Sequence, residues 1–210
     1  MPDTPVEATP VEATPVEATP VEATPGAATS VSWVPSTAPI ADVIASRIRD
    51  IQDFPTPGVV FKDFTPLLSD GAALRAVVRD ISGRYSGAVD VVVGVEARGF
   101  ILGAAVAYEL GIGFVPVRKA GKLPGRTHSA EYDLEYGSAV IELHTDAFAL
   151  GARVLVMDDV LATGGTAKAT CELIERTGAT VVAVEVVLEL GFLKGRSMLP
   201  GRNVHAMLSL

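Results

Sequence analysis

The sequence of 210 residues predicts an α/β fold, an open and mainly parallel twisted sheet flanked by helices. Two observations support this prediction. Short runs rich in Val and Ile alternate with segments of helical periodicity, as in chains whose parallel strands are joined by crossover helices. The runs are apolar almost throughout, which is typical of strands that are buried on both faces.

The first 38 residues differ in composition from the rest of the chain. Residues 6–25 are four tandem copies of Val-Glu-Ala-Thr-Pro, and further prolines follow at Pro35 and Pro39. Proline at every fifth position removes amide donors and disfavours helix before it, so we expect a disordered leader, with a partner-binding repeat as the alternative. The chain is thus divided into a low-complexity leader, residues 1–38, and one domain, residues 39–210.

The domain is expected to begin with two helices. Apolar residues recur at helical spacing after Pro39, which suits a first helical turn: Ile40, Val43, Ile44, Ile48 and Ile51. Ser69 is the predicted N-cap of the second helix. On one face of that helix lie Leu74, Val77, Val78, Ile81 and Tyr85. Residues 53–68, between the helices, are rich in Pro, Phe and Asp and are predicted to form a loop.

Strands and helices then alternate. The predicted strands are residues 89–95, 113–117, 153–157 and 180–188, and the predicted helices are residues 100–110 and 166–177.

Two neighbouring segments lie outside this alternation. Residues 138–144 alternate apolar and polar side chains, so an exposed antiparallel strand is expected there. Residues 119–137 contain glycines, a proline and two tyrosines with little periodicity. They predict a mobile loop or two-stranded flap that would exclude water from a reacting centre, with a surface loop of no catalytic role as the alternative.

Composition and charge narrow the possible classes of function. The net charge is -8, but five acidic residues lie in the leader and no Lys or Arg precedes Arg47, so the domain is only mildly acidic. We therefore expect no nucleic-acid partner, since duplex binding needs clustered Lys and Arg. No apolar run approaches the ~18 residues that cross a bilayer, and no signal peptide is recognisable. The lone Cys171 fits a helix core in a reducing compartment, so a cytoplasmic location without membrane contact is predicted.

The segment after the third predicted strand carries the strongest chemical signal. It reads Asp158-Asp159-Val160-Leu161-Ala162-Thr163-Gly164-Gly165-Thr166, directly ahead of a helix. Two glycines let backbone amides close around a phosphate, two threonine hydroxyls add donors, and the helix N-terminus favours the anion. Asp158 and Asp159 would accept hydrogen bonds from sugar hydroxyls or from waters on a divalent ion. A strand-to-helix turn with a capping acid explains single residues but not the whole string, which predicts a site for a phosphorylated sugar.

Basic side chains follow the neighbouring strands, at the edge of a parallel sheet where ligands gather. Arg98 comes shortly after the strand that ends at residue 95, and its guanidinium fork suits a pyrophosphate. The alternative is an ion pair with Glu96 or another surface acid. Arg118, Lys119 and Lys122 concentrate positive charge at the end of the next strand, where a solvated basic patch is the alternative.

The nine-residue string resembles the phosphoribosyl pyrophosphate signature of the type I phosphoribosyltransferases. The flanking segments are similar to the members of that family that use adenine: residues 53–63, 96–100, 117–125 and 132–137. The resemblance runs from about residue 40 to the C-terminus. Lys62 stands where Arg is frequent, Glu96 and Ala97 where Asp and Ser are frequent, and Met157 where another aliphatic residue is frequent. None of these changes removes a group that the chemistry needs.

The resemblance implies a flexible flap, a small base-binding hood and a homodimer. It implies the reaction of adenine with phosphoribosyl pyrophosphate to give AMP and pyrophosphate, a step of purine salvage that depends on Mg2+. The ion would be held by phosphoribosyl pyrophosphate without a direct protein ligand, with Asp158 and Asp159 reaching it through water. Two rivals stay open: a phosphoribosyltransferase for xanthine, guanine or orotate, and a non-catalytic regulator that senses phosphoribosyl pyrophosphate.

The resemblance also assigns roles to individual residues. Glu135 would act as acid or base on the purine and Tyr136 would close the flap, with a solvent-facing strand position as the alternative for Glu135. The remaining assignments are phosphate binding by Ala162, Thr163, Gly164, Gly165 and Thr166, ribose binding by Asp158 and Asp159, pyrophosphate binding by Arg98, Arg118, Lys119 and Lys122, and adenine binding by Val60, Phe61 and Lys62. Phe61 would stack on the base, with a core role as its alternative.

Overall fold

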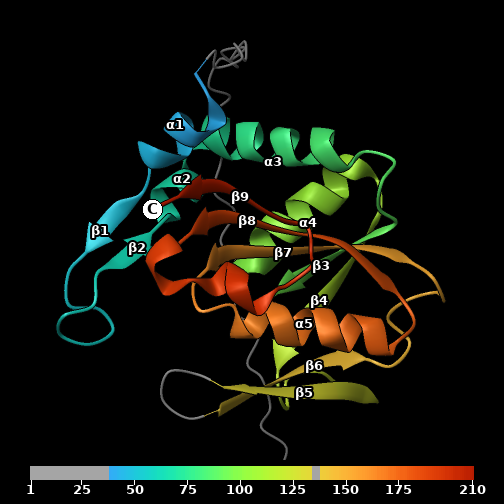
Figure 1. The fold of residues 1–210 in the computed structure, drawn as a ribbon. Helices are drawn as coiled ribbons and strands as arrows, with labels where there is room; N and C mark the ends of the chain where they lie inside the picture. The colour runs from blue at the N-terminus through green and yellow to red at the C-terminus, as the bar shows by residue number, and fades with distance from the viewer. Residues whose placement is uncertain (1–37, 134–137) are drawn as a thin grey trace, which may run out of the picture. The chain divides into compact units, whose positions relative to one another are not determined.

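Seven strands form one sheet within residues 38–133 and 138–210, the residues that the computed structural model describes (Figure 1). The strand order is β5-β6-β4-β3-β7-β8-β9. The strands β3 (Val91–Val95), β4 (Gly113–Lys119), β7 (Arg153–Leu161), β8 (Thr180–Glu189) and β9 (Val204–Ser209) are parallel to one another. At one edge of this sheet, β6 (Ser138–His144) pairs antiparallel with both β4 and β5 (Thr127–Asp133). The predicted α/β class with a mainly parallel sheet is confirmed.

Helices cover both faces of this sheet. The helices α3 (Gly71–Tyr85) and α4 (Arg98–Leu110) lie on one face, and α5 (Gly165–Arg176) lies on the other (Figure 1). The sheet curls, so that α5 packs against β7 and β8 and also against β5 and β6. Among the described residues, no helix combines the length and apolarity needed to span a bilayer.

The apolar core is divided by the sheet into two clusters. Side chains alternate along β7, because successive residues of a strand point to opposite faces. Leu155 and Met157 are fully buried in the cluster beneath α3 and α4. Val154 and Val156 are fully buried in the cluster that contacts α5. Cys171 lies in this second cluster, as predicted, and burial raises the pKa of its thiol to about 11.

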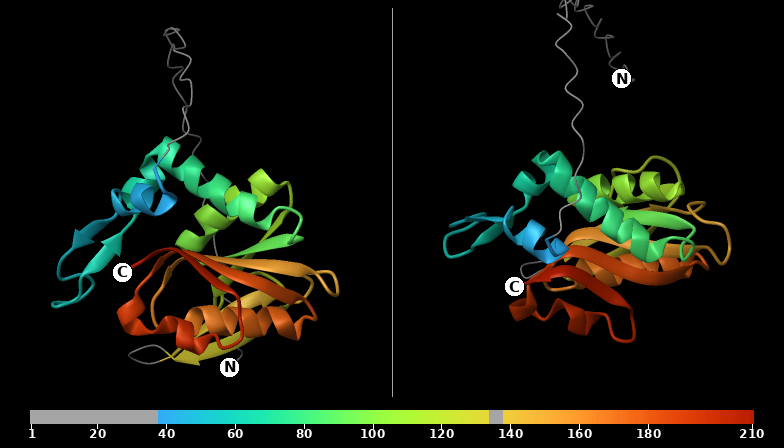
Figure 2. Two further views of the ribbon diagram at one scale, coloured as in Figure 1. Left: turned by 45° about the horizontal axis from the view of Figure 1, so that its top comes forward. Right: turned by 90° about the horizontal axis from the view of Figure 1, so that it is seen from above.

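A separate two-stranded sheet precedes the main one in the chain. It pairs β1 (Arg49–Ile51) antiparallel with β2 (Phe61–Asp63), and lies beside α1 (Ile40–Ala45) and α2 (Thr65–Ser69) in both views of Figure 2. The expected first helix is therefore wrong beyond Ala45, and the expected loop 53–68 contains a strand and a short helix. Strand pairing overrides the helical spacing here, and the Arg49 guanidinium reaches the buried Asp63 carboxylate across the pair at 2.6 Å.

Several other features differ from the sequence prediction. The N-cap of α3 is Asp70 instead of Ser69, because Asp70 accepts hydrogen bonds from the amides of residues 72 and 73 while Ser69 ends α2. The strand β7 continues to Leu161 because its pairing with β8 continues, and β4 continues to Lys119. The strand β6 is antiparallel as expected but buries Ile141 and Leu143. The parallel strand β9 was not predicted.

Two predictions lie outside the described residues. These are the disorder of the leader and the roles of Glu135 and Tyr136. The predicted flap, residues 119–137, contains the strand β5, whose antiparallel partner β6 lies directly after the flap, so the flap supplies one strand of this pair and not both. Its mobility stays a prediction.

Candidate active site

Two adjacent carboxyl groups lie near the carboxyl end of β7. Asp158 Oδ1 accepts a hydrogen bond of 2.8 Å from the backbone amide of Asp159. Loss of water around Asp158 and the neighbouring Asp159 carboxylate raise the pKa of Asp158 well above 3.8. Asp159 is 7% exposed, and its Oδ2 has no hydrogen-bond partner in geometry among the described residues. Buried acceptors are normally satisfied, so apart from an ion pair with Arg98 the Asp159 carboxylate keeps acceptor capacity that the described residues do not use.

The predicted phosphate segment connects this pair to α5. Gly164 is the N-cap residue with φ 86°, a left-handed conformation that favours glycine. Because the cap residue is glycine, no side chain of that residue caps the amides of the first turn of α5, and this turn contains no acidic residue. A small cavity of about 70 Å³ is lined by Asp158, Thr163, Gly164, Thr166 and Val186, among others. An uncapped helix N-terminus beside a polar cavity is suited to an anion.

Arg98 connects the acidic pair to the predicted adenine segment. It is the first residue of α4, and its Nη2 lies 2.9 Å from Asp159 Oδ2. Its guanidinium carbon lies 5.2 Å from the centre of the Phe61 ring and 5.1 Å from that of Phe64, both within the range of cation–π attraction. Arg98 thus pairs with the buried Asp159 of the predicted ribose site, and not with Glu96 or another surface acid as its alternative expected.

The start of α4 approaches β7 closely. A Cβ atom on Gly99 would lie 2.7 Å from the Met157 carbonyl oxygen and 3.2 Å from Asp158 Oδ1. Any larger residue would therefore push α4 away from the acidic pair. The glycine in this position holds Arg98 within reach of Asp159.

The residues predicted to bind adenine lie in and before β2. Phe61 is partly exposed and stacks edge-on against Phe54 at 5.2 Å, so a purely core role is wrong. Lys62 directs its Nζ to Asp50, 2.8 Å from both carboxylate oxygens. Val60 is 42% exposed. The ring of Phe61 is therefore the member of this set that reaches the rest of the site, through Arg98.

The predicted pyrophosphate cations at the end of β4 gather around Glu96. Its Oε1 lies 3.2 Å from both Arg118 Nη2 and Lys122 Nζ, and its Oε2 accepts the Lys119 amide at 2.9 Å. The Lys119 amide, followed by the two cations, lowers the pKa of Glu96 to about 2. The Glu96–Ala97 peptide bond is cis. Arg118 Nε is buried and has no hydrogen-bond partner among the described residues, so one donor of the cluster is unused.

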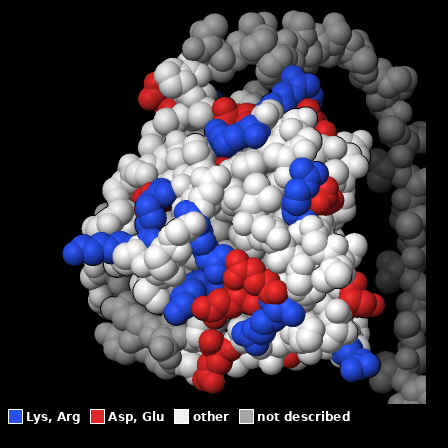
Figure 3. All heavy atoms as spheres, turned by 45° about the vertical axis from the view of Figure 1, so that its right-hand side comes forward, with Lys and Arg blue, Asp and Glu red and all other residues white. Residues whose placement is uncertain are grey.

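Glu96 is the residue whose place in this cluster the sequence analysis missed. It had been noted as a departure from the family and as an alternative partner of Arg98. Its position directly after β3, at the same sheet edge as the cations after β4, was the available signal. On the face in Figure 3, several Lys and Arg lie beside Asp and Glu, and the basic groups form no continuous band.

The β5–β6 hairpin borders the phosphate segment. Glu131 and Tyr132 of β5 line a cavity of about 150 Å³ together with Gly165 and Lys168 at the start of α5. The described part of the chain contains no group of three or more His, Cys, Asp or Glu side chains arranged to hold a metal ion. The hairpin thus brings the positions next to residues 134–137 to the same edge of the sheet as the acidic pair.

The chain matches known proteins over most of its length. The family model of the phosphoribosyl transferase domain matches residues 68–197. The adenine phosphoribosyltransferase of Salinispora tropica is 60% identical over 172 residues, which are 81% of this chain and 91% of that protein.

Two solved structures extend this likeness to the fold. The adenine phosphoribosyltransferase of Thermoanaerobacter pseudethanolicus has a TM-score of 0.78 and 44% identity, covering 81% of this chain and 99% of that chain. That of Saccharomyces cerevisiae, in complex with D-2,5-dideoxy-2,5-imino-altritol 1,6-bisphosphate and adenine, has a TM-score of 0.77 and 38% identity, covering 80% and 98%. The chain is therefore a transferase that belongs to the phosphoribosyltransferase family, within its adenine phosphoribosyltransferase group.

Proposed function

We propose that this chain catalyses the Mg2+-dependent reaction of adenine with phosphoribosyl pyrophosphate, giving AMP and pyrophosphate, as a step of purine salvage. The observation that carries the proposal is the buried acidic pair beside an uncapped helix N-terminus, which Arg98 links to the Phe61 ring by its ion pair with Asp159. The acids suit a ribose, the helix N-terminus suits a phosphate, and the aromatic ring suits a base. The yeast relative holds adenine and a bisphosphorylated iminosugar together, which supports this ligand set.

Each part of the sugar phosphate has its own group of residues in this proposal. The amides and hydroxyls of residues 162–166 bind the 5-phosphate, and Asp158 and Asp159 accept hydrogen bonds from the ribose hydroxyls. Arg98, Arg118, Lys119 and Lys122 bind the pyrophosphate. Negative charge builds on that group as it leaves the anomeric carbon, so donors fixed in advance around it stabilise the transition state.

The base is held by the segment around β2. Phe61 stacks on the purine, and backbone groups of Val60 and Lys62 meet its exocyclic amine and ring nitrogens. The Lys62 ammonium group is engaged by Asp50, which supports recognition through the backbone of Lys62. Hypoxanthine and guanine carry an oxo group where adenine carries the amine, so they would leave polar groups unpaired and are disfavoured.

The acidic pair also fits the Mg2+ ion that the family implies. Asp159 Oδ2 lacks a hydrogen-bond partner among the described residues, and a carboxylate oxygen is a ligand that accepts from metal-bound water. When bound with phosphoribosyl pyrophosphate, the ion would neutralise part of the charge on the leaving group. Asp158 and Asp159 would hold it through water.

Glu135 and Tyr136, which lie between β5 and β6 in the sequence, complete the proposal. Glu135 exchanges a proton with the purine as its ring nitrogen attacks the anomeric carbon, and Tyr136 covers the site. Exclusion of water matters because an oxocarbenium-like centre would otherwise be hydrolysed. The homodimer and the cytoplasmic location belong to the same proposal and depend on the family resemblance.

A pyrophosphate-release assay tests the reaction and its specificity together. The full chain is mixed with phosphoribosyl pyrophosphate, Mg2+ and one of five bases: adenine, hypoxanthine, guanine, xanthine or orotate. We expect release with adenine, far weaker release with the other bases, and a loss of release when Mg2+ is chelated. Release with another base alone would support the rival transferase, and binding without turnover would support the regulator.

The substitution Glu135→Gln tests the catalytic role of Glu135. Glutamine keeps the shape and one acceptor but cannot exchange a proton, so turnover should fall by ~100-fold or more while the KM for adenine changes much less. Tyr136→Phe serves as the companion variant and should lose less activity, because the ring that covers the site remains. A Glu135→Gln protein with near-normal turnover would reduce Glu135 to a positioning residue.

A further inference from the structure

A short segment after β8 packs directly against the backbone of the predicted phosphate segment, residues 162–166. It consists of two 3-10 helices, η1 (Gly191–Leu193) and η2 (Gly195–Met198). A Cβ atom on Gly195 would overlap the Ala162 carbonyl group and approach the Gly164 amide nitrogen at 3.1 Å. A Cβ atom on Gly164 would in turn overlap the Gly195 carbonyl group. The two segments therefore touch backbone to backbone, with no side chain between them that could adjust.

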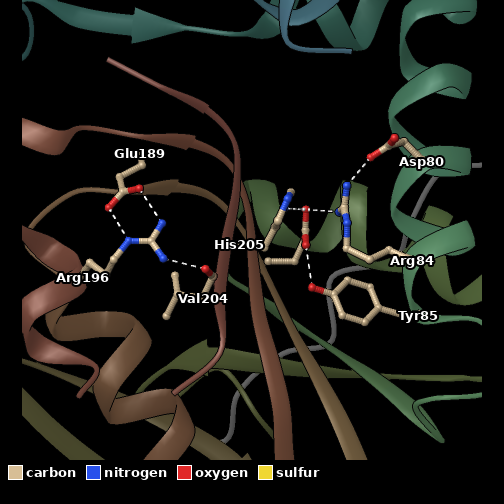
Figure 4. Close-up of polar contacts among 8 residues, drawn as sticks. Asp80, Arg84, Tyr85, Glu189, Arg196, Val204 and His205 are labelled. Carbon is tan, nitrogen blue, oxygen red and sulfur yellow. Dashed lines mark hydrogen bonds and ion pairs between the residues drawn. The ribbon is translucent and has the colours of Figure 1, made fainter. Parts of the chain in front are cut away.

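Ion pairing fixes the position of η2. Arg196 donates from Nε and Nη2 to the two carboxylate oxygens of Glu189, at 3.1 and 2.7 Å (Figure 4). Its third nitrogen donates to the Val204 carbonyl oxygen at 2.6 Å. Glu189 is 8% exposed and ends β8, so its carboxylate is held by the sheet. A bidentate pair of this kind fixes orientation as well as distance.

The backbone at both ends of the segment is tied to the core. The Leu190 amide donates to the Leu161 carbonyl oxygen at 2.9 Å, immediately before the phosphate segment begins. Leu199, directly after η2, is 2% exposed and belongs to the core cluster that contacts α5. The segment is thus anchored at its start, at Arg196 and at its end. Between these anchors, the backbone at Gly195 contacts residues 162–164.

We propose that Gly195, held by the Arg196–Glu189 pair, is a positioning residue that sets the geometry of residues 162–166 and thereby the affinity for sugar 5-phosphates. This inference rests on the proposed function, which assigns those residues to the 5-phosphate. A change that pushes residues 162–164 forward would misplace the amides at the start of α5. The groups assigned to pyrophosphate lie at the start of α4 and at and after the end of β4, and would keep their geometry.

Two matched pairs of variants test this assignment in the full-length chain. Gly195→Ala is compared with Gly83→Ala, since a Cβ atom on Gly83 in α3 would meet nothing within 4 Å. Arg196→Met is compared with Arg196→Lys, which keeps the charge but loses the bidentate fork. The readouts are the Kd for ribose 5-phosphate, the KM for phosphoribosyl pyrophosphate, the KM for pyrophosphate in the reverse reaction, and the thermal midpoint.

Gly195→Ala should weaken ribose 5-phosphate binding by at least tenfold, since a misplacement of ~1 Å in a site can cost ~100-fold. The KM for pyrophosphate should stay within about threefold of wild type, and Gly83→Ala should bind like wild type. Arg196→Met should weaken ribose 5-phosphate binding in the same direction, with partial rescue in Arg196→Lys. Should Gly195→Ala fail to fold, the two Arg196 variants decide the question.

Three results would overturn the inference in distinguishable ways. Normal ribose 5-phosphate binding in folded Gly195→Ala, or in Arg196→Met, would reject the positioning role and leave the proposed function intact. An equal loss for pyrophosphate and ribose 5-phosphate would indicate general loosening of the fold instead. A wild-type chain that neither binds ribose 5-phosphate nor turns over phosphoribosyl pyrophosphate would reject the proposed function and this inference with it.

Discussion

Neighbouring strands of the sheet carry two acidic sites that the fold treats in opposite ways. On β8, Glu185 is fully buried, and both of its oxygens have partners: Arg84 Nη1 at 2.9 Å and His205 Nδ1 at 2.9 Å from Oε1, and the Tyr85 hydroxyl at 2.7 Å from Oε2 (Figure 4). On β7, Asp159 Oδ2 makes an ion pair with Arg98, but no described donor is oriented to give it a hydrogen bond.

The two sites lie at nearly the same level of the sheet, so depth alone does not explain the difference. Glu185 is opposite Met157 in the register, and Val186 is opposite Asp158. Side chains alternate between the two faces along β8, and Glu185 points to the face covered by α3. There the adjacent residues Arg84 and Tyr85 supply donors. Asp158 and Asp159 instead stand where β7 approaches the phosphate segment, and the chain supplies few donors there.

The difference separates a structural acid from one that is kept for a ligand. A satisfied buried network stabilises one arrangement of its elements, here α3 on β8 and β9. An incompletely satisfied pair costs stability, and such costs gather at functional sites. Burial and the hydrogen bond to Glu185 raise the pKa of Tyr85, which keeps its hydroxyl a donor.

The largest effect is expected when both acids of the unsatisfied site are neutralised. Asp158→Asn with Asp159→Asn removes two charged acceptors worth ~1.5 to 3 kcal/mol each, so kcat/KM for phosphoribosyl pyrophosphate should fall by roughly 100-fold or more. The thermal midpoint should fall less than in a variant without Glu185, because Asp159 loses an ion pair with one partly exposed arginine whereas Glu185 has three partners. Steady-state kinetics and calorimetry check the two halves of this prediction. A double variant with unchanged kinetics would move the ribose site elsewhere.

A loss of stability without a matching loss of activity is expected at the satisfied site. Glu185→Ala leaves Arg84, Tyr85 and His205 without their shared acceptor and opens a cavity, so unfolding should become easier by about 3 kcal/mol. For a domain of this size the thermal midpoint would drop by roughly 6 to 12 °C. The kcat of the folded protein should stay within about threefold of wild type.

Asp80→Ala is the matched control for Glu185→Ala. Asp80 is the exposed partner of the same arginine, at 2.5 Å from Arg84 Nη2, and exposed pairs contribute only about 0 to 1 kcal/mol. If the two substitutions lowered the thermal midpoint equally, burial of Glu185 would not be what makes its network structural.

The parts of the molecule that depend on local signals could be predicted from the sequence. The strands β3, β7 and β8 are continuous apolar runs, and β6 alternates, so their positions follow from periodicity. The segment from Asp158 to Thr166 also carries its signal locally, since two acids, two threonines and two glycines fall within nine residues. Its placement beside α5 follows from the strand-to-helix order.

The parts that depend on distant partners could not be predicted. Ile48 and Ile51 follow the helical spacing, but β1 forms because residues 61–63 pair with it from ten residues further on. The strand β9 is short, and it pairs with β8 across the 3-10 segment. The partners of Glu185 include Tyr85, 100 positions away, and nothing in the sequence around either residue reveals the contact.

The same limit applies to the site. The sequence predicted a cation cluster but not the internal carboxylate of Glu96 that organises it, because this contact joins the ends of two strands that are 22 positions apart. The contact of Gly195 with Ala162 is likewise invisible in a sequence. Only the close approach of two backbones, which side-chain patterns do not record, makes glycine necessary there.

The smallest expected effect is a gain of stability, and it tests the comparison most directly. The single substitution Asp158→Asn removes a carboxyl group whose pKa is raised by burial and by Asp159. In the unfolded chain this carboxyl group ionises near pH 3.8, whereas in the folded chain it holds its proton to a higher pH. Unfolding therefore becomes more favourable for the wild type as the pH rises from about 4 through the raised folded pKa, and then the effect levels off. The Asn variant lacks this penalty.

Melting curves of ligand-free protein in chelator across this pH range provide the measurement. The thermal midpoint of Asp158→Asn should match that of wild type near pH 4 and exceed it at pH 8, by a difference that grows until the pH passes the raised folded pKa of Asp158. Asp146→Asn, at an exposed position, controls for the loss of a surface charge. A variant that is less stable than wild type at pH 8 would mean that Asp158 is satisfied by the fold, as Glu185 is. The acid would then belong to the framework, and the contrast between the two strands would no longer identify the ligand site.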